Sequence, residues 1–81
     1  MMDIDIAMTL DVRNELPPTP TIKFSIVTEV LDKGSVLEVI VGNEASCKNI
    51  KNLVKSKNLE LVHHVKQSTD YFLYVRKNHE N

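Results

Sequence analysis

Apolar and polar residues alternate along the first twelve positions of the chain. The apolar residues, each two positions from the next, are Ile4, Ile6, Met8, Leu10 and Val12. A period of two is typical of a β-strand that buries one face and exposes the other. The pattern therefore predicts a half-buried strand over residues 3–12.

The period becomes helical after three prolines, Pro17, Pro18 and Pro20. The apolar residues that recur there at helical spacing are Ile22, Phe24, Ile26, Val27, Val30 and Leu31. We expect this stripe to face the core and the polar residues between its members to face solvent. Those polar residues are Ser25, Thr28, Glu29 and Asp32.

The prolines also predict where this helix begins. A residue that precedes proline avoids the helical region, so we expect Pro17 and Thr19 to be extended. Proline is favoured in the first helical position, which predicts a helix that begins at Pro20 with Thr19 as its N-cap. Gly34 is expected to end the helix as its C′ residue.

Three further segments complete the pattern. Residues 36–41 form an apolar, β-branched run that predicts a strand, with Leu37, Val39 and Val41 inward. Asn43 is expected to cap a helix over residues 45–57. The apolar side of that helix comprises Cys47, Ile50, Leu53 and Val54.

Alternation returns near the end of the chain. Residues 59–66 predict a strand, and a polar turn at 67–70 leads to a last strand over 71–77. The residues expected on one face of the first of these strands are Leu59, Leu61, His63 and Val65.

The predicted order is β-α-β-α-β-β. Helices with one apolar stripe each, alternating with strands, indicate an α+β two-layer sandwich, with a four-stranded mixed sheet and both helices on one face. The open sheet face would then carry an apolar group, Ile40, Val62, Phe72 and Tyr74, beside Glu38, Glu60, His64 and Arg76. An apolar group of this size predicts that a protein partner or a second copy of the chain covers it.

Length and composition are consistent with one domain over residues 1–81. With 81 residues and 42% apolar composition, the chain can bury only a small core. The longest apolar run is a few residues, which predicts neither a membrane span nor a secretory signal. The single cysteine, Cys47, fits a reducing compartment, so we expect a cytoplasmic protein.

Charge is distributed unevenly along the chain. Residues 1–46 hold eight acids and three bases, whereas residues 47–81 hold three acids and seven bases. Lys48, Lys51 and Lys55 recur at helical spacing and would form a basic ridge able to neutralise phosphates. Because neither aromatic residues nor arginines interleave them, we interpret the ridge as a solvated face and keep a small nucleic-acid-binding module as an alternative.

The histidines do not predict a metal site. His63 and His64 are consecutive in a predicted strand, so their side chains leave on opposite faces. His79 falls near the C-terminus, where we expect a frayed tail. With one cysteine and no ligand pair at zinc-site spacing, the sequence predicts no metal and no cofactor.

Residues 10–20 read LDVRNELPPTP. They resemble the pattern Leu-Asp-x-Arg-Gly-x-x-Cys-Pro-x-Pro of the TusA/SirA-like family of small sulfur carriers and sulfurtransferases, which includes the YedF-like proteins. The matching residues are Leu10, Asp11, Arg13, Pro18 and Pro20. The resemblance continues with correct spacing in residues 31–39 and in the closing pair Arg76-Lys77, and it implies the same β-α-β-α-β-β sandwich.

The resemblance also implies a mechanism that this chain departs from. In the family the motif cysteine receives sulfur as a persulfide and passes it on, whereas Pro17 stands at that position here. Asn14 replaces the motif glycine, and asparagine tolerates positive φ. We therefore expect no sulfur carriage by the family route.

The resemblance further implies that the loop before the first helix is the functional region. The residues we single out there are Asp11, Arg13, Pro17, Pro18, Thr19 and Pro20. In the family, the residues matching Asp11 and Arg13 help to shape the loop that presents the cysteine. Here we expect the two to brace each other or a backbone donor.

Cys47 leaves one alternative open. A free cysteine on an apolar helix face is most often a small buried residue, and we expect this role. If it were exposed, the thiolate would be favoured near a helix N-terminus with Lys48 and Lys51 close by, and the chain could carry sulfur there. The favoured interpretation is a non-catalytic, protein-binding or regulatory family member that uses the loop and the open sheet face.

Overall fold

The computed structural model describes residues 5–78 of the chain. Its elements are β1 (Ile6–Asp11), α1 (Thr19–Val30), β2 (Val36–Val41), α2 (Glu44–Ser56), β3 (Glu60–Gln67) and β4 (Asp70–Arg76). This order confirms the predicted β-α-β-α-β-β sequence of elements. None of the helices within residues 5–78 has the length and apolar character needed to cross a membrane.

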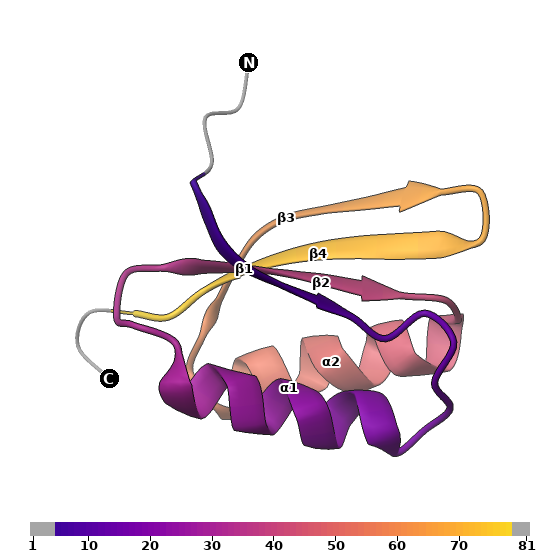
Figure 1. Cartoon of the computed structure of the whole chain (residues 1–81), viewed down its shortest axis with the longest axis horizontal. Coiled ribbons are helices and arrows are strands. Elements are labelled where there is room, and N and C mark those ends of the chain that lie inside the picture. The colour runs from indigo at the N-terminus through magenta and orange to yellow at the C-terminus, as the bar shows by residue number, and fades with distance from the viewer. Residues whose placement is uncertain (1–4, 79–81) are drawn as a thin grey trace.

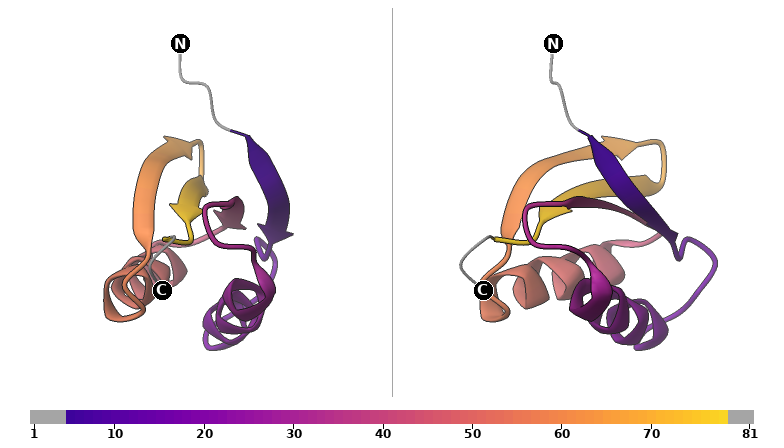
Figure 2. Two further views of the ribbon diagram at one scale, coloured as in Figure 1. Left: turned by 90° about the vertical axis from the view of Figure 1, so that its left-hand side faces the viewer. Right: turned by 60° about the vertical axis from the view of Figure 1, so that its left-hand side comes forward.

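The four strands form one mixed sheet in the order β1-β2-β4-β3. β1 pairs in parallel with β2, whereas β4 pairs antiparallel with both β2 and β3. Both helices pack on the same face of this sheet, as Figures 1 and 2 show. The predicted two-layer α+β sandwich is confirmed, and α1 supplies the crossover that a parallel β1–β2 pair requires.

The core lies between the sheet and the two helices. Its buried members are Val12, Phe24, Leu31, Leu37, Val39, Val41, Cys47, Ile50, Val54, Leu73 and Val75. The inward side chains of β2 are fully buried, as predicted, because β2 lies between β1 and β4. α2 also begins as expected, since the Asn43 side-chain oxygen accepts a hydrogen bond of 2.7 Å from the Ser46 amide.

The N-terminus of α1 differs from the prediction. The helix begins at Thr19, which is not extended, and Pro18 is the N-cap, without a side-chain cap hydrogen bond. The Thr19 amide donates to the Leu16 carbonyl (3.0 Å), and the Thr21 hydroxyl donates to the Pro18 carbonyl (2.8 Å). Pro20 falls in the first turn, where a missing amide proton is harmless, so the bias against a helical residue before proline is overridden.

The C-terminus of α1 also differs. The helix ends at Val30, and Gly34 lies instead in the following turn with φ 86°, so it is not the C′ residue. A side chain from beyond β4 binds the last turn: the Lys77 ammonium donates to the carbonyls of Thr28 (2.8 Å) and Glu29 (3.3 Å). These carbonyls lack partners within a helix, so Lys77 acts as a C-terminal cap supplied from the far end of the chain.

The buried face of α1 was predicted only in part: Phe24 and Leu31 are buried and Val27 packs against the core, as expected. Pro20, Phe24 and Thr28 are buried, whereas Ile22, Ile26 and Val30 are 53%, 61% and 69% exposed. Thr28, expected in solvent, satisfies its hydroxyl by donating to the Ser25 carbonyl (3.1 Å). Because the apolar residues of this helix cover much more than one face, periodicity alone does not identify the side that meets the sheet.

β1 is shorter than predicted and only partly inward. A register shift lies between Ile6 and Met8, and both of these side chains are exposed. Leu10 and Val12 reach the core as expected. The irregularity breaks the alternation, and the strand lies at the edge of the sheet, so its first half gains little burial. Ile4 lies outside the described residues.

β3 contains a second register shift, between Leu61 and His63. Leu61 lies opposite the buried Val75, whereas His63 and Val65 lie opposite Tyr74 and Phe72 on the open face. The expected common face for Leu61, His63 and Val65 is therefore wrong. His64, expected on the open face, lies opposite the buried Leu73 instead, and His79 falls outside the described residues.

Candidate functional site

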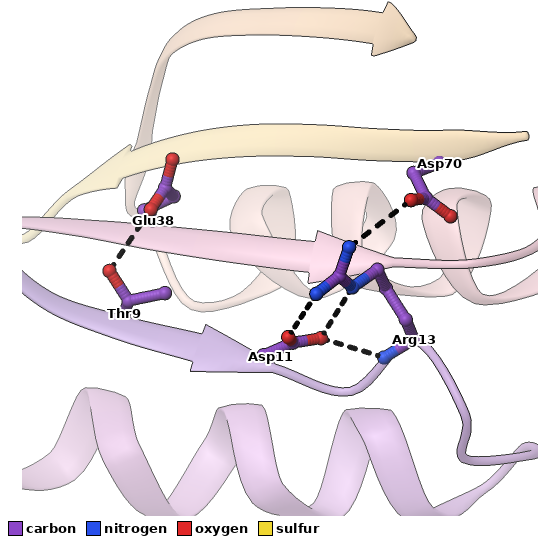
Figure 3. A network of polar contacts seen from close by, with 5 residues as sticks. All are labelled: Thr9, Asp11, Arg13, Glu38 and Asp70. Carbon is purple, nitrogen blue, oxygen red and sulfur yellow. Dashed lines mark hydrogen bonds and ion pairs between the residues drawn. The ribbon is translucent and has the colours of Figure 1, made fainter. Parts of the chain in front are cut away.

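The loop between β1 and α1, residues 12–18, is held by Arg13. Its guanidinium binds Asp11 in two places, with Nη2 2.7 Å from Oδ2 and Nε 3.0 Å from Oδ1, while its backbone amide donates to Oδ1 (3.2 Å). Its third nitrogen reaches Asp70 at the start of β4 (3.4 Å), as Figure 3 shows. The predicted bracing of Asp11 and Arg13 is confirmed, and it extends to the β3–β4 turn.

Electrostatics keep this pair charged. The hydrogen bonds from Arg13 hold the pKa of Asp11 below its ordinary value, and Asp11, then Asp70, raise the pKa of Arg13. A carboxylate that accepts several hydrogen bonds from a guanidinium is a poor proton acceptor. The pair therefore stays ionised at neutral pH and shapes the loop.

The loop also lies against the turn between β2 and α2. A Cβ atom added to Gly42 would come within 2.5 Å of the Arg13 carbonyl oxygen, so only glycine fits at this contact. On the other side, the Val12 amide donates to the Ile40 carbonyl (2.9 Å). No local sequence pattern marks this close approach, because Gly42 and Arg13 are distant in the sequence.

The proline segment projects from the fold just before α1. Leu16 is 75% exposed, and Pro17 and Pro18, joined by a cis peptide bond, are exposed too. An ion pair between Glu15 and Lys23 (2.7 Å) links the segment to the first turns of α1. The structure therefore presents Pro17 at the surface next to the N-terminus of a helix.

Pro17 and Pro18 form one end of an apolar groove of about 660 Å³ between α1 and α2. Ile22 and Ile26 line it along α1, and Leu53 lines it from α2. Sequence reasoning placed Ile22 and Ile26 in the core and so missed the groove. The clue was available, because α1 has more apolar residues than one buried stripe requires.

Cys47, unlike the proline segment, is buried. It is 4% exposed and belongs to the core, which confirms the predicted packing role. Burial raises the pKa of its thiol, an effect that the nearby Lys51 opposes and Glu44 reinforces. A thiol of this kind is protonated at neutral pH and shielded from large reaction partners.

The open sheet face combines apolar and polar side chains. Ile40 and Phe72 lie opposite each other, with Ile40 buried and Phe72 half-buried, and Val62 falls at the β3 bulge. Next to them, Glu38 accepts hydrogen bonds from the Tyr74 hydroxyl (2.9 Å) and from Thr9 (3.0 Å).

Tyr74 makes a second contact on this face, because its ring stacks on His63 with centroids 5.9 Å apart. Burial and the Glu38 carboxylate raise the pKa of the Tyr74 hydroxyl, so it stays protonated and keeps donating. Glu38, with its hydrogen-bonded partners Thr9 and Tyr74, therefore interrupts the group of four residues expected on this face. The group does not form one apolar patch.

The lysines of α2 lie on its outer side. Lys48 and Lys55 are exposed, Lys51 is half-buried, and none of them forms an ion pair with a residue in 5–78. Across the same described residues, no cluster of three or more histidine, cysteine or acidic side chains is arranged to hold a metal ion.

Comparisons with known proteins agree with this architecture. The profile of the family described as sulfurtransferase TusA matches residues 8–77. The crystal structure of the SirA-like protein from Desulfitobacterium hafniense is similar in fold, with a TM-score of 0.77 at 19% identity over 88% of this chain and 97% of that one. No curated protein sequence matches the chain significantly. Since the TusA profile spans most of the sequence, the protein belongs to the TusA sulfurtransferase family.

Proposed function

We propose that this chain is a TusA-family domain that does not carry sulfur and acts by binding another protein. The observation that carries the proposal is the residue at the family's cysteine position. Pro17 is exposed before α1, where a thiol would be a good nucleophile, but its ring nitrogen is part of an amide and has no reactive lone pair.

The only cysteine does not offer a substitute. Sulfur transfer requires a thiolate that attacks the outer sulfur of a donor persulfide, so that the donor's S–S bond breaks and the donor leaves as a thiolate. Cys47 is buried, and burial raises the pKa of its thiol. Both properties favour a packing role over the alternative of a carrier that acts through Cys47.

The contact surface in this proposal is the β1–α1 loop with the adjoining part of α1. Leu16, Ile22 and Ile26 expose more than half of their surface there. Ile22 and Ile26 line one groove with Pro17 and Pro18, and exposed apolar side chains that lie together mark protein-binding surfaces. The open sheet face, which we also considered, is a weaker candidate because Glu38 and its hydrogen-bonded partners interrupt it.

A basic ridge for nucleic acid has less support. Lys48, Lys51 and Lys55 lack neighbouring arginines or aromatic side chains on α2, and these are what single-stranded nucleic acids stack on. The unpaired cysteine also fits a reducing compartment, so the proposal takes the partner to be cytoplasmic.

Incubation with a persulfide-loaded donor, followed by intact-mass measurement, tests the proposal. We expect no added sulfur on the native chain, and the same result for Cys47→Ser. A gain of one sulfur that disappears in Cys47→Ser would contradict the proposal and make Cys47 the carrier.

A further inference from the structure

The groove between α1 and α2 has walls suited to apolar side chains of another protein. Ile22 and Ile26, four residues apart on α1, form one wall, and Leu53 of α2 lies across from them. Pro17 and Pro18 close one end. Residues four apart on a helix lie on the same line, so this wall runs parallel to α1 for about one turn or more.

The rim of the groove on α2 is positively charged. Asn52 lines the groove, and Lys48, four residues before it, and Lys55, three residues after it, are its neighbours on the helix surface. Glu44 is the one acidic residue of α2, and neither lysine forms an ion pair with a residue in 5–78. On the α1 side, Lys23 is already paired with Glu15.

These two features identify the chemistry of an occupant. Apolar side chains would fill the groove, and carboxylates would lie beside Lys48 and Lys55 of α2, as electrostatic complementarity requires. A second copy of the chain would bring like-charged α2 helices to one interface. A nucleic acid would match the lysines but not the isoleucine wall.

We infer that the groove binds an acidic amphipathic helix of a partner protein, with its apolar side in the groove and its carboxylates beside Lys48 and Lys55. The inference rests on the proposed function in protein binding, for which it gives the surface and the class of partner. Helices that dock in this way use apolar residues at positions i, i+4 and i+7.

Fluorescence anisotropy with a synthetic helical peptide tests the inference. The probe carries leucines at positions i, i+4 and i+7 and glutamates on its other sides, and a matched peptide has lysines in place of the glutamates. We expect the acidic peptide to bind, its affinity to fall as salt rises, and the lysine peptide not to bind. Equal binding of both peptides, or of neither, would overturn the inference.

Matched variants locate the binding surface. We expect Ile26→Ser to weaken binding of the acidic peptide about tenfold, since a buried branched side chain is lost from the interface. Val30→Ser, one turn further along α1, is the control: Val30 is similarly exposed but does not line the groove, and its replacement should leave the affinity unchanged. An equal loss in both variants would overturn the groove as the site.

Charge variants test the rim in the same way. Lys48→Gln and Lys55→Gln should each weaken binding about two- to threefold at low salt, whereas Lys33→Gln, in the turn after α1, should have no effect. Equal effects of all three would contradict a specific rim.

Other occupants give distinct results. A concentration-dependent dimer that Ile26→Ser converts to monomer would identify a second copy of the chain as the occupant and overturn the inference. Displacement of the peptide by duplex DNA would identify a nucleic acid as the occupant and overturn it too. Peptide binding involves no sulfur, so its failure leaves the persulfide result intact. Sulfur found on Cys47 would contradict the proposal that the chain does not carry sulfur, and the peptide result would still stand.

Discussion

Single residues fix the loop that precedes α1. Arg13 binds both carboxylate oxygens of Asp11 and reaches Asp70, which joins the end of β1 to the start of β4. Gly42 allows the Arg13 carbonyl to lie against the β2–α2 turn. The loop therefore keeps its shape through contacts that do not involve Pro17.

The Asp11–Arg13 pair predicts a small dependence of stability on pH. A carboxyl group whose pKa falls on folding adds stability above its unfolded pKa, about 4, and this contribution is lost as pH falls through the lower folded value. We expect Asp11→Asn to lower the urea midpoint slightly at neutral pH, with the difference disappearing once the pH lies below the folded pKa of Asp11. The pair is exposed, so the effect is small.

Asp5→Asn is the matched control, because Asp5 is exposed and forms no ion pair with a residue in 5–78. A urea midpoint that Asp11→Asn lowers equally at neutral and very low pH would show that the effect does not come from the carboxylate charge.

The contact at Gly42 predicts a larger effect. Gly42→Ala places a methyl group 2.5 Å from the Arg13 carbonyl oxygen, so the loop or the turn must move. Overpacking of this kind typically destabilises by about 1–3 kcal/mol. Urea denaturation measures the loss, and amide NMR shifts at Arg13 and Asn14 locate it. Unchanged stability and unchanged shifts would contradict the close approach.

At the scale of elements, α1 is unusual because it is apolar on its outer side as well as its inner side. Phe24 is fully buried, whereas Ile22 and Ile26 line the groove and are exposed. The helix is also capped from a distance, since Lys77 donates to the carbonyls of Thr28 and Glu29. Lys77, the first residue after β4, therefore helps to define where α1 ends.

The two sides of α1 predict different mutational effects. Phe24→Ala removes a fully buried ring and should destabilise the fold by about 3–5 kcal/mol. Ile22→Ala and Ile26→Ala should change the free energy of unfolding by less than about 0.5 kcal/mol, because these side chains are mostly exposed. Chemical denaturation of the three variants measures this contrast, and a large loss for Ile26→Ala would place its side chain in the core.

The cap at the end of α1 gives another prediction. Lys77→Met keeps the aliphatic stem but removes the ammonium, and we expect a loss of about 1 kcal/mol. Arg76→Met is the control, because its ion pair with Glu60 is long, at 3.4 Å, and exposed; it should cost less than about 0.5 kcal/mol. Similar losses in both variants, measured by thermal or urea unfolding, would argue against a capping role.

At the scale of the whole molecule, the architecture was predictable and the surface was not. Element order, the inward side of β2 and the Asn43 cap follow from local periodicity and turn chemistry. The residues around Pro17 carried the resemblance to the family, which the profile match confirms. The hydrophobic pattern did not decide which of the apolar residues on α1 face the sheet.

The errors have physical causes in long-range packing. Register shifts in β1 and β3 depend on partner strands, so a strict period of two placed Ile6 and His64 on the wrong face. The groove depends on how α1 and α2 lie relative to each other, which no local pattern of Ile22 or Leu53 encodes. Local sequence identifies elements well, but faces depend on contacts between elements.

The central proposal is that this TusA-family domain keeps the family scaffold and lacks the nucleophile that carries sulfur. The most direct measurement is the intact mass of two chains after the same treatment with a persulfide donor: the native chain, and Pro17→Cys in a Cys47→Ser background. We expect the native chain to gain nothing and the variant to gain one sulfur atom, because its thiol would lie exposed before α1. A native chain that takes up sulfur as readily as the variant would contradict the account.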